Sequence, residues 1–203
     1  MLHAHDSASR LGRDRHRRGR NLRAWLLPAA LSAALFPLAS AAAAAPPAGI
    51  DACALLTPDE VSAVVGKKVE TVQPYDNGIT VQGAHSTTCI WAAPLAPGVL
   101  PNPALRLGGR GFVVVNVINW PGGARDAHKF LDGFQKAFRE HDIKSKPVAV
   151  KVGADESLWW GDGVAARKNG VSIGVSVAQF GDRAARQPQA ESLAKLILKR
   201  LPA

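Results

Sequence analysis

Apolar residues recur at helical spacing in three stretches of the chain. The first opens at Thr57, which can cap a helix, followed by Pro58 at the first helical position and Glu60 placed for a capping box. Valines form its apolar stripe, and Gly66 supplies the C-terminal stop. The second begins at Asp126, with the expected buried face Ala127, Phe130, Leu131, Phe134, Ala137 and Phe138. The third opens at Pro188, with the stripe Ala190, Leu193, Ala194, Ile197, Leu198 and Leu201.

Alternating or continuous apolar runs between these stretches predict strands. The runs 69–73 and 79–82 flank the turn signal Tyr75–Gly78, and a further strand is expected over 87–93. The run 112–120 is apolar on both faces, which favours a central position in a sheet.

Four more strands are expected in the C-terminal half, over 148–152, 158–160, 164–168 and 171–180. The last two flank Asn169 and Gly170, and an Asn-Gly pair between such segments is a strong hairpin signal. Because the elements are joined by hairpins rather than regular crossovers, the pattern predicts an α+β fold. We expect an antiparallel sheet with about three helices packed on one face.

The N-terminal segment has the features of a secretory signal peptide. Residues 1–23 carry seven arginines, residues 24–39 form an apolar run, and Ser40 and five alanines follow. The apolar run is too short to span a bilayer and contains two prolines. We therefore expect a signal peptide over 1–43, a linker over 44–50 and a single exported domain over 51–203.

Three other fates of the leader stay open. It is retained as a membrane anchor if it is not cleaved. Arg17 and Arg18 resemble a twin-arginine signal, although the residues that follow them match it poorly and favour the general secretory route. A lipoprotein would need Cys53 to close a lipobox, but Asp51 stands where that motif requires a small residue.

Removing the leader changes the charge of the protein. The full chain has 25 basic and 16 acidic residues, a net charge of +9. Without the seven basic and two acidic residues of the leader, 18 basic and 14 acidic residues remain, a net charge of +4. The basic balance therefore belongs largely to the export signal and does not indicate nucleic-acid binding.

The chain has two cysteines, Cys53 and Cys89. Two cysteines in an exported domain favour a disulfide, because oxidising compartments keep such bonds closed. The bond would join the start of the first helix to a strand. No further cysteines complete a zinc site, and we expect neither a metal nor a cofactor.

Four segments resemble a broad group of small exported bacterial domains with two cysteines. They are Cys-Ala-Leu-Leu-Thr-Pro-Asp-Glu-Val at 53–61, Cys-Ile-Trp at 89–91, Val-Gly-Ala-Asp-Glu-Ser-Leu-Trp at 152–159 and Ala-Lys-Leu-Ile-Leu-Lys-Arg-Leu at 194–201. The group includes uncharacterised lipoproteins and is similar to the extracellular sensor domains of some actinobacterial serine/threonine kinases. The resemblance covers about 150 residues and implies a fold and a disulfide. It carries over no catalytic residues, and this sequence lacks both a usable lipobox and a kinase domain.

Residues able to do chemistry are sparse. No serine stands in a Gly-x-Ser-x-Gly setting, and with both cysteines bridged no thiolate remains as a nucleophile. His128 and Asp132 stand four apart and are either half of a metal site or, more commonly at this spacing, solvated surface residues.

Two segments are not explained by folding alone. The first, 94–110, is rich in proline and glycine, and its arginines can bind a carboxylate or a phosphate. The second, 155–162, sets acidic residues beside two tryptophans, of which one is expected in the core and the other at the surface. The candidate ligand-contacting residues are Arg106, Arg110, Asp155, Glu156, Trp159 and Trp160.

These observations predict a periplasmic or secreted module of the cell envelope that binds a ligand or a protein partner and does not catalyse. The alternatives are an envelope hydrolase and a structural or assembly partner in the envelope. A groove with converging histidine and carboxylate groups favours the hydrolase, and an exposed apolar patch favours the assembly partner. No nucleic-acid partner and no membrane span after cleavage are expected.

The leader generates a first prediction. We expect the mature N-terminus to lie between Ala42 and Ala45 and the protein to be found outside the cytoplasm. Intact-mass measurement of the envelope fraction checks this. Material that retains residues 1–40 would contradict it.

Overall fold

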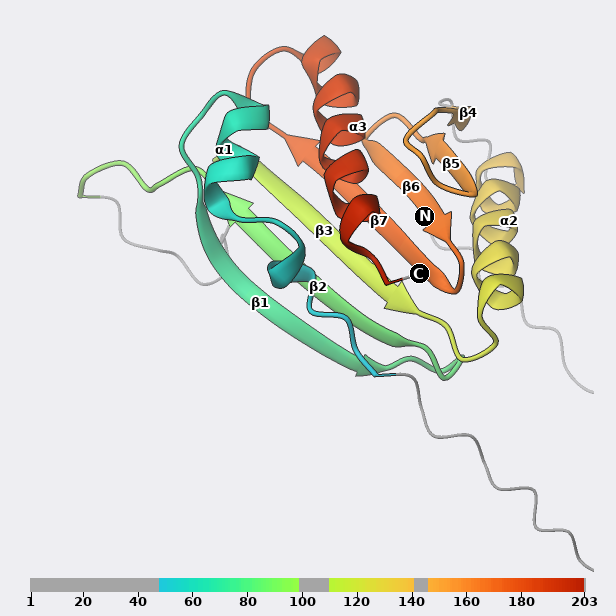
Figure 1. Ribbon diagram of the computed structural model, residues 1–203. Coiled ribbons are helices and arrows are strands. Elements are labelled where there is room, and N and C mark those ends of the chain that lie inside the picture. The colour runs from blue at the N-terminus through green and yellow to red at the C-terminus, as the bar shows by residue number, and fades with distance from the viewer. Residues whose placement is uncertain (1–47, 99–109, 141–145, 203) are drawn as a thin grey trace, which may run out of the picture. The chain divides into compact units, whose positions relative to one another are not determined.

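The computed structural model describes residues 48–98, 110–140 and 146–202. The expected signal peptide, most of the linker and Arg106 lie outside the described residues. Within these ranges lie the 3-10 helix η1 (Ala52–Leu55) and the α-helices α1 (Pro58–Val65), α2 (Ala124–Glu140) and α3 (Arg183–Arg200), which Figure 1 labels.

The strands form one seven-stranded sheet in the order β1-β2-β3-β7-β6-β5-β4. They are β1 (Glu70–Ile79), β2 (His85–Ala92), β3 (Phe112–Asn119), β4 (Val148–Ala149), β5 (Glu156–Trp159), β6 (Gly163–Lys168) and β7 (Val171–Ala178). Every pairing within the sheet is antiparallel, which confirms the α+β class. Strand β3 lies between β2 and β7, the interior position predicted from its apolar faces.

The main core lies between one face of the sheet and the layer formed by η1, α1 and α3. Alternate residues of β7, from Val171 to Val177, face this core, as do Cys89 and Trp91 of β2. The predicted stripe of α3 is buried against them, with Leu193 and Ile197 fully inaccessible to solvent. Burial of this continuous apolar layer is the main source of the stability of the fold.

Helix α2 packs on the opposite face of the sheet. Its Leu131 contacts Leu158 of β5 and Ala165 of β6. Ala165 stands between Val164 and Ala166, which both face the main core, so strand alternation places it on the other side. The three helices are therefore divided between the two faces, α1 and α3 on one and α2 on the other. An amphipathic stripe shows that a helix packs, but not against which face.

The buried face of α2 is also narrower than its sequence predicts. Only Ala127 and Leu131 are fully buried, whereas Phe130 is 38 % exposed. Phe134 and Phe138 are partly buried and contact each other with ring centroids 4.9 Å apart. The helix lies over the strands at one side of the sheet, mainly β6, so its outer flanks have no layer above them among the described residues.

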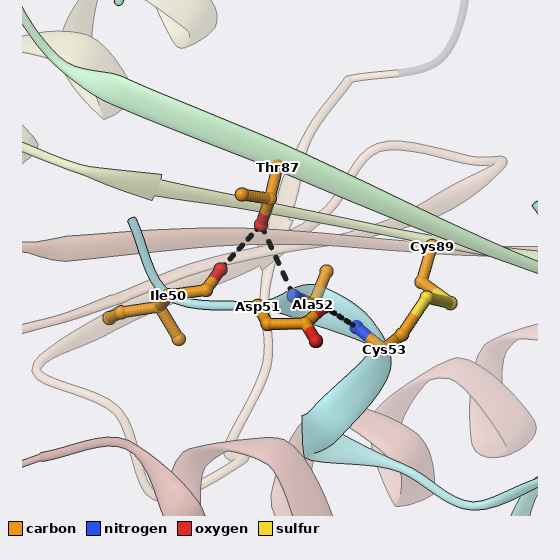
Figure 2. The surroundings of a disulfide bond; sticks show 6 residues. All are labelled: Ile50, Asp51, Ala52, Cys53, Thr87 and Cys89. Atoms are coloured by element: carbon orange, nitrogen blue, oxygen red, sulfur yellow. Dashed lines mark hydrogen bonds between the residues drawn. A yellow bond between two sulfur atoms is a disulfide. The ribbon is translucent and has the colours of Figure 1, made fainter. Parts of the chain in front are cut away.

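The expected disulfide joins Cys53 to Cys89 (Figure 2), with the two Cα atoms 5.1 Å apart. Cys53 lies in η1, directly ahead of α1, and Cys89 lies in β2. The Thr87 hydroxyl adds two hydrogen bonds, since it donates to the Ile50 carbonyl and accepts from the Ala52 amide. The Asp51 carboxylate accepts from the Cys53 amide at 2.8 Å and caps η1.

Helix α1 begins and ends as predicted. Thr57 and Glu60 form a reciprocal capping box, and Gly66 adopts the left-handed conformation with φ 69°. Glu60 has a further partner that the sequence did not reveal, the Arg200 side chain at the end of α3. The hydrogen bond from Arg200 lowers the pKa of Glu60 to about 2. Arg200 also donates to the Leu55 carbonyl, so one side chain joins η1, α1 and α3.

The turn expected at Tyr75–Gly78 is instead part of a continuous strand. Strand β1 runs through it with a register shift between Asp76 and Gly78. The Asp76 carboxylate accepts from the Gly78 amide at 2.8 Å and lies 2.7 Å from His85 Nε2, so the local turn chemistry produces a bulge. The reversal comes later, at Thr80–Ala84, where the Thr80 amide donates to the Ala84 carbonyl.

Two further elements differ from the sequence predictions. Helix α3 begins at Arg183 rather than at Pro188, because Asp182 caps it by accepting from the Ala184 amide at 3.2 Å. Pro188 lies inside the helix. Strand β4 has two residues instead of the five expected over 148–152.

The hairpin signal at Asn169-Gly170 is confirmed. Lys168 pairs with Val171 across it, and Asn169 has a φ of 52°. A Cβ at Gly170 would lie 2.8 Å from the Cα of Gly123, so a glycine allows this hairpin to touch the start of α2. No helix among the described residues is long and apolar enough to cross a membrane.

The disulfide generates a second prediction. The double variant Cys53→Ser/Cys89→Ser should lose up to about 3.8 kcal/mol of unfolding free energy, the chain-entropy estimate for a separation of 36 residues. For a domain of this size, this corresponds to a melting temperature lower by about 8–15 °C. Thermal unfolding by circular dichroism measures it, and reduced wild-type protein is the matched control. A double variant that melts with the oxidised wild type would contradict the expected contribution.

Candidate functional site

The acidic part of the predicted segment 155–162 lies where β5 begins. Glu156 pairs with Arg167 of β6 across the antiparallel ladder, which puts both side chains on the same face of the sheet. This is the face that carries α2. The register of β5 and β6 therefore decides what surrounds the two carboxylates.

Arg167 bridges the two acidic residues. Its Nη1 donates to Asp155 Oδ2 at 3.1 Å, and its Nη2 donates to Glu156 Oε1 at 2.6 Å. Asp155 also accepts from the amide of Asn169 at 2.7 Å, which attaches it to the β6–β7 hairpin. Because the Arg167 side chain is only 15 % exposed, these charge-assisted bonds are partly shielded from water. The carboxylates are held in fixed positions.

Helix α2 adds His128 to this cluster. Its Nδ1 lies 2.8 Å from Glu156 Oε1, and its Nε2 lies 3.3 Å from Asp132 Oδ2. Each ring nitrogen thus faces a carboxylate. Both contacts are hydrogen bonds at the same time only when the ring carries two protons. The spacing of His128 and Asp132 noted in the sequence does place them together, with Glu156 as a third partner.

The electrostatics of the cluster keep its central pair ionised. Arg167, and to a lesser extent His128, lowers the pKa of Glu156 below its ordinary value. Conversely, Glu156 raises the pKa of Arg167. Five charged or titratable residues from α2, β5, β6 and the segment before β5 thus form one network, which we call the α2 ion network: Asp132, His128, Glu156, Arg167 and Asp155.

A cleft of about 720 Å³ opens beside the α2 ion network. It lies between α2 and the segment 149–158, and its volume is in the range of small-molecule sites. Leu131, Val152 and Leu158 supply its apolar lining. The polar lining consists of His128, Asp132, Gln135, Lys151, Asp155, Glu156 and Ser157.

The two predicted tryptophans do not line this cleft. Trp159 packs against the main core, and Trp160 packs on the α2 side against Phe134, with ring centroids 5.5 Å apart. Adjacent strand residues thus point to opposite faces as expected, but both side chains are partly buried. A Cβ at Gly163 would lie 2.5 Å from the Trp160 ring, so this glycine leaves room for the indole. Trp160 packs behind Leu131 and Leu158, and Trp159 packs against the core cluster that includes Val152, so both contact clusters whose residues line the cleft.

Arg110 lies in another part of the fold. Its Nη1 donates to the Ala93 carbonyl at 3.1 Å and is 3.7 Å from Glu70, at the β1–β2 side of the sheet. Three strands, β3, β7 and β6, separate that side from β5. The structure therefore does not bring Arg110 together with the acidic segment, and its side chain is only 12 % exposed.

The cleft brings His128 together with carboxylates, which is the arrangement expected of a hydrolase. Among the residues that the structure describes, no group of three or more His, Cys, Asp and Glu side chains is arranged to hold a metal ion. His128 has a carboxylate partner, as a general base does. However, the hydroxyl of Ser157 donates to the Val150 carbonyl at 2.7 Å and so is committed to the backbone.

Sequence reasoning did not single out Arg167, Lys151 or Gln135. The sequence does indicate on which face of the sheet Arg167 lies, because the Asn-Gly hairpin sets the end of β6 and side chains alternate along that strand. Its partner on β5 depends on a register that no turn signal specifies. The chain matches no family model, no curated protein and no solved structure.

The lowered pKa of Glu156 generates a third prediction. A carboxylate whose folded pKa is depressed stabilises the fold above its ordinary pKa of 4.5, and this contribution is lost as the pH falls through the lower folded value. The stability of Glu156→Gln should therefore fall less steeply than that of the wild type below about pH 4.5. Urea unfolding at a series of pH values measures the difference.

The matched control is Glu140→Gln, which removes an exposed carboxylate at the end of α2. This control should keep the wild-type dependence on pH. If Glu156→Gln also follows the wild-type curve, the ion pair with Arg167 does not stabilise the folded state.

Proposed function

We propose that this protein is an exported, disulfide-linked binding module of the cell envelope. Its ligand carries a positively charged amino or guanidinium group and occupies the cleft between α2 and segment 149–158. The observation that carries this proposal is the charged lining of the cleft. The lining includes three carboxylates, Asp132, Asp155 and Glu156, and one lysine, Lys151.

Preorganisation supports the same conclusion. Asp155 and Glu156 are held by Arg167, and Arg167 neutralises only part of their charge. A cation that enters the cleft finds acceptor oxygens already oriented, so little side-chain entropy is lost on binding. Apolar lining from Leu131 and Leu158 favours a ligand with an aliphatic stem behind its charged group.

The compartment is inferred from two independent features. The arginine-rich leader with its apolar run predicts export. The Cys53–Cys89 disulfide is the kind of bond that persists in oxidising compartments such as the periplasm. A binding module stabilised by a disulfide fits the envelope, where a domain works without cytoplasmic chaperones.

An envelope hydrolase is the second candidate function. The contact between His128 and Glu156 favours it, since a histidine held by a carboxylate can activate a water molecule or a hydroxyl. Turnover of a captured ligand would distinguish this candidate. The binding module releases its ligand unchanged, whereas the hydrolase releases a product of altered mass.

Calorimetric titration with spermidine and cadaverine tests the binding proposal and provides a fourth prediction. Both amines should bind, and Asp132→Asn and Asp155→Asn should each weaken binding about two- to fivefold, as expected for partly exposed charge pairs. The matched control is Asp162→Asn, which removes an exposed carboxylate of the same segment outside the cleft.

Equal weakening by all three variants would show non-specific attraction and contradict a site in the cleft. So would unchanged binding in Asp132→Asn and Asp155→Asn. Capture of envelope components on the purified protein, with mass spectrometry of what is retained, then identifies the natural ligand. Retained compounds that all lack a cationic group would overturn the assignment.

A further inference from the structure

A second cavity, of about 390 Å³, lies beside the N-terminal half of α2. It is lined by Gln82, Trp120, Asp126, Lys129 and Phe130, none of which lines the first cleft. At 3.6 residues per turn, the α2 residues that line the two cavities point about 160° apart. The two cavities therefore lie on opposite flanks of the helix, and we call this one the aromatic pocket.

Trp120 forms a fixed wall of the aromatic pocket. It is 8 % exposed and packs with Ala84 and Ala127. Its indole N–H donates to the Ser172 hydroxyl at 2.9 Å, and its backbone amide donates to the Gly170 carbonyl at 2.9 Å. With its polar atom satisfied inside the protein, the indole offers the pocket only its aromatic surface.

Phe130 forms the second aromatic wall. Its ring centroid is 5.2 Å from that of Trp120, and the two ring planes are inclined by 39°. Phe130 is one of the few large apolar side chains that the described residues leave exposed. The exposed Phe130 ring, packed against Trp120 beside a cavity, gives the pocket an aromatic contact surface for a ligand.

The rim of the aromatic pocket is polar and carries groups of both charges. Asp126 lies 4.0 Å from Lys129 and 3.2 Å from Arg125, and Gln82 reaches the pocket from the turn after β1. A Cβ at Gly122 would lie 2.0 Å from Asp126 Oδ2, so the glycine allows the carboxylate to pack closely over the backbone. The rim thus presents carboxylate acceptors, ammonium donors and an amide that does both.

We infer that the aromatic pocket binds a saccharide, with one pyranose ring seated against Phe130 and Trp120. A pyranose has an apolar face of C–H groups, which suits an aromatic wall, and an edge of hydroxyls that need both donors and acceptors. A purely aliphatic ligand would remove water from Gln82 and from the Asp126–Lys129 pair without offering them hydrogen bonds in return. A ligand with a strong net charge of either sign would meet both signs at the rim, since Asp126 lies beside Lys129 and Arg125.

This inference does not depend on the cationic ligand of the first cleft. The two sites share α2 but no lining residue. Together they describe a domain that holds two different chemical groups on the two flanks of one helix.

Two-dimensional NMR of tryptophan indole N–H signals, with tri-N-acetylchitotriose and maltotriose as probes, tests the saccharide site and provides a fifth prediction. The Trp120 signal is assigned by its loss in Trp120→Phe. At least one probe should shift this signal in a saturable manner. Phe130→Ala should weaken binding about tenfold, and Gln82→Ala about two- to fivefold.

The matched control is Phe138→Ala, which removes an aromatic ring from the same helix outside the pocket. It should bind as the wild type does, and so should Asp132→Asn of the first cleft. If Phe130→Ala does not fold, Gln82→Ala and Lys129→Ala test the saccharide site instead. Both side chains are exposed, so their truncation should leave the fold intact. A Trp120 signal that responds to neither probe, or unchanged affinity in the folded pocket variants, would overturn the assignment.

Discussion

The attachment of residues 50–53 to strand β2 is the constraint on which the helical layer depends. The disulfide to Cys89 fixes one end of this short segment, and the Thr87 hydroxyl fixes the other through two backbone groups. Helix α1 starts five residues after Cys53, so its position follows from that attachment. Arg200 then joins the Leu55 carbonyl and the Glu60 carboxylate to the end of α3. Two helices far apart in sequence thereby cover the same face of the sheet, and the burial of Leu193 and Ile197 follows.

The opposite face of the sheet is polar at its centre, unlike the apolar face that packs against α1 and α3. Polar and small side chains occupy its centre, where Asn116 donates to Ser86 and Thr88 and stands opposite Gly174. Such a surface offers little apolar area for a second complete helical layer. Helix α2 therefore packs at one side, over β6, where Leu158 and Ala165 supply an apolar patch. Both flanks of α2 border cavities.

The parts of this fold that could be predicted are those encoded by local chemistry. The capping box of Thr57 and Glu60 and the hairpin at Asn169 each depend on residues close in sequence. The disulfide could be predicted because two cysteines allow only one pairing. The errors occur where two local signals compete. Tyr75–Gly78 carries turn residues, yet pairing with β2 retains the strand and reduces the turn to a bulge. Pro188 is a good helix start, yet Asp182 caps the helix earlier.

In the candidate site, too, contacts between residues close in sequence could be predicted and contacts set by strand pairing could not. The sequence identified the acidic segment and placed His128 beside Asp132, because both inferences use short spacings. It did not reveal that Arg167 lies between Asp155 and Glu156, because that contact is set by the β5–β6 register. The difference changes the chemistry. Free carboxylates would repel one another and would bind any cation weakly through mobile side chains. Bridged by Arg167, they become a fixed set of acceptors whose charge is only partly neutralised, so binding in the proposed site would depend on the shape of the cleft as well as on its charge.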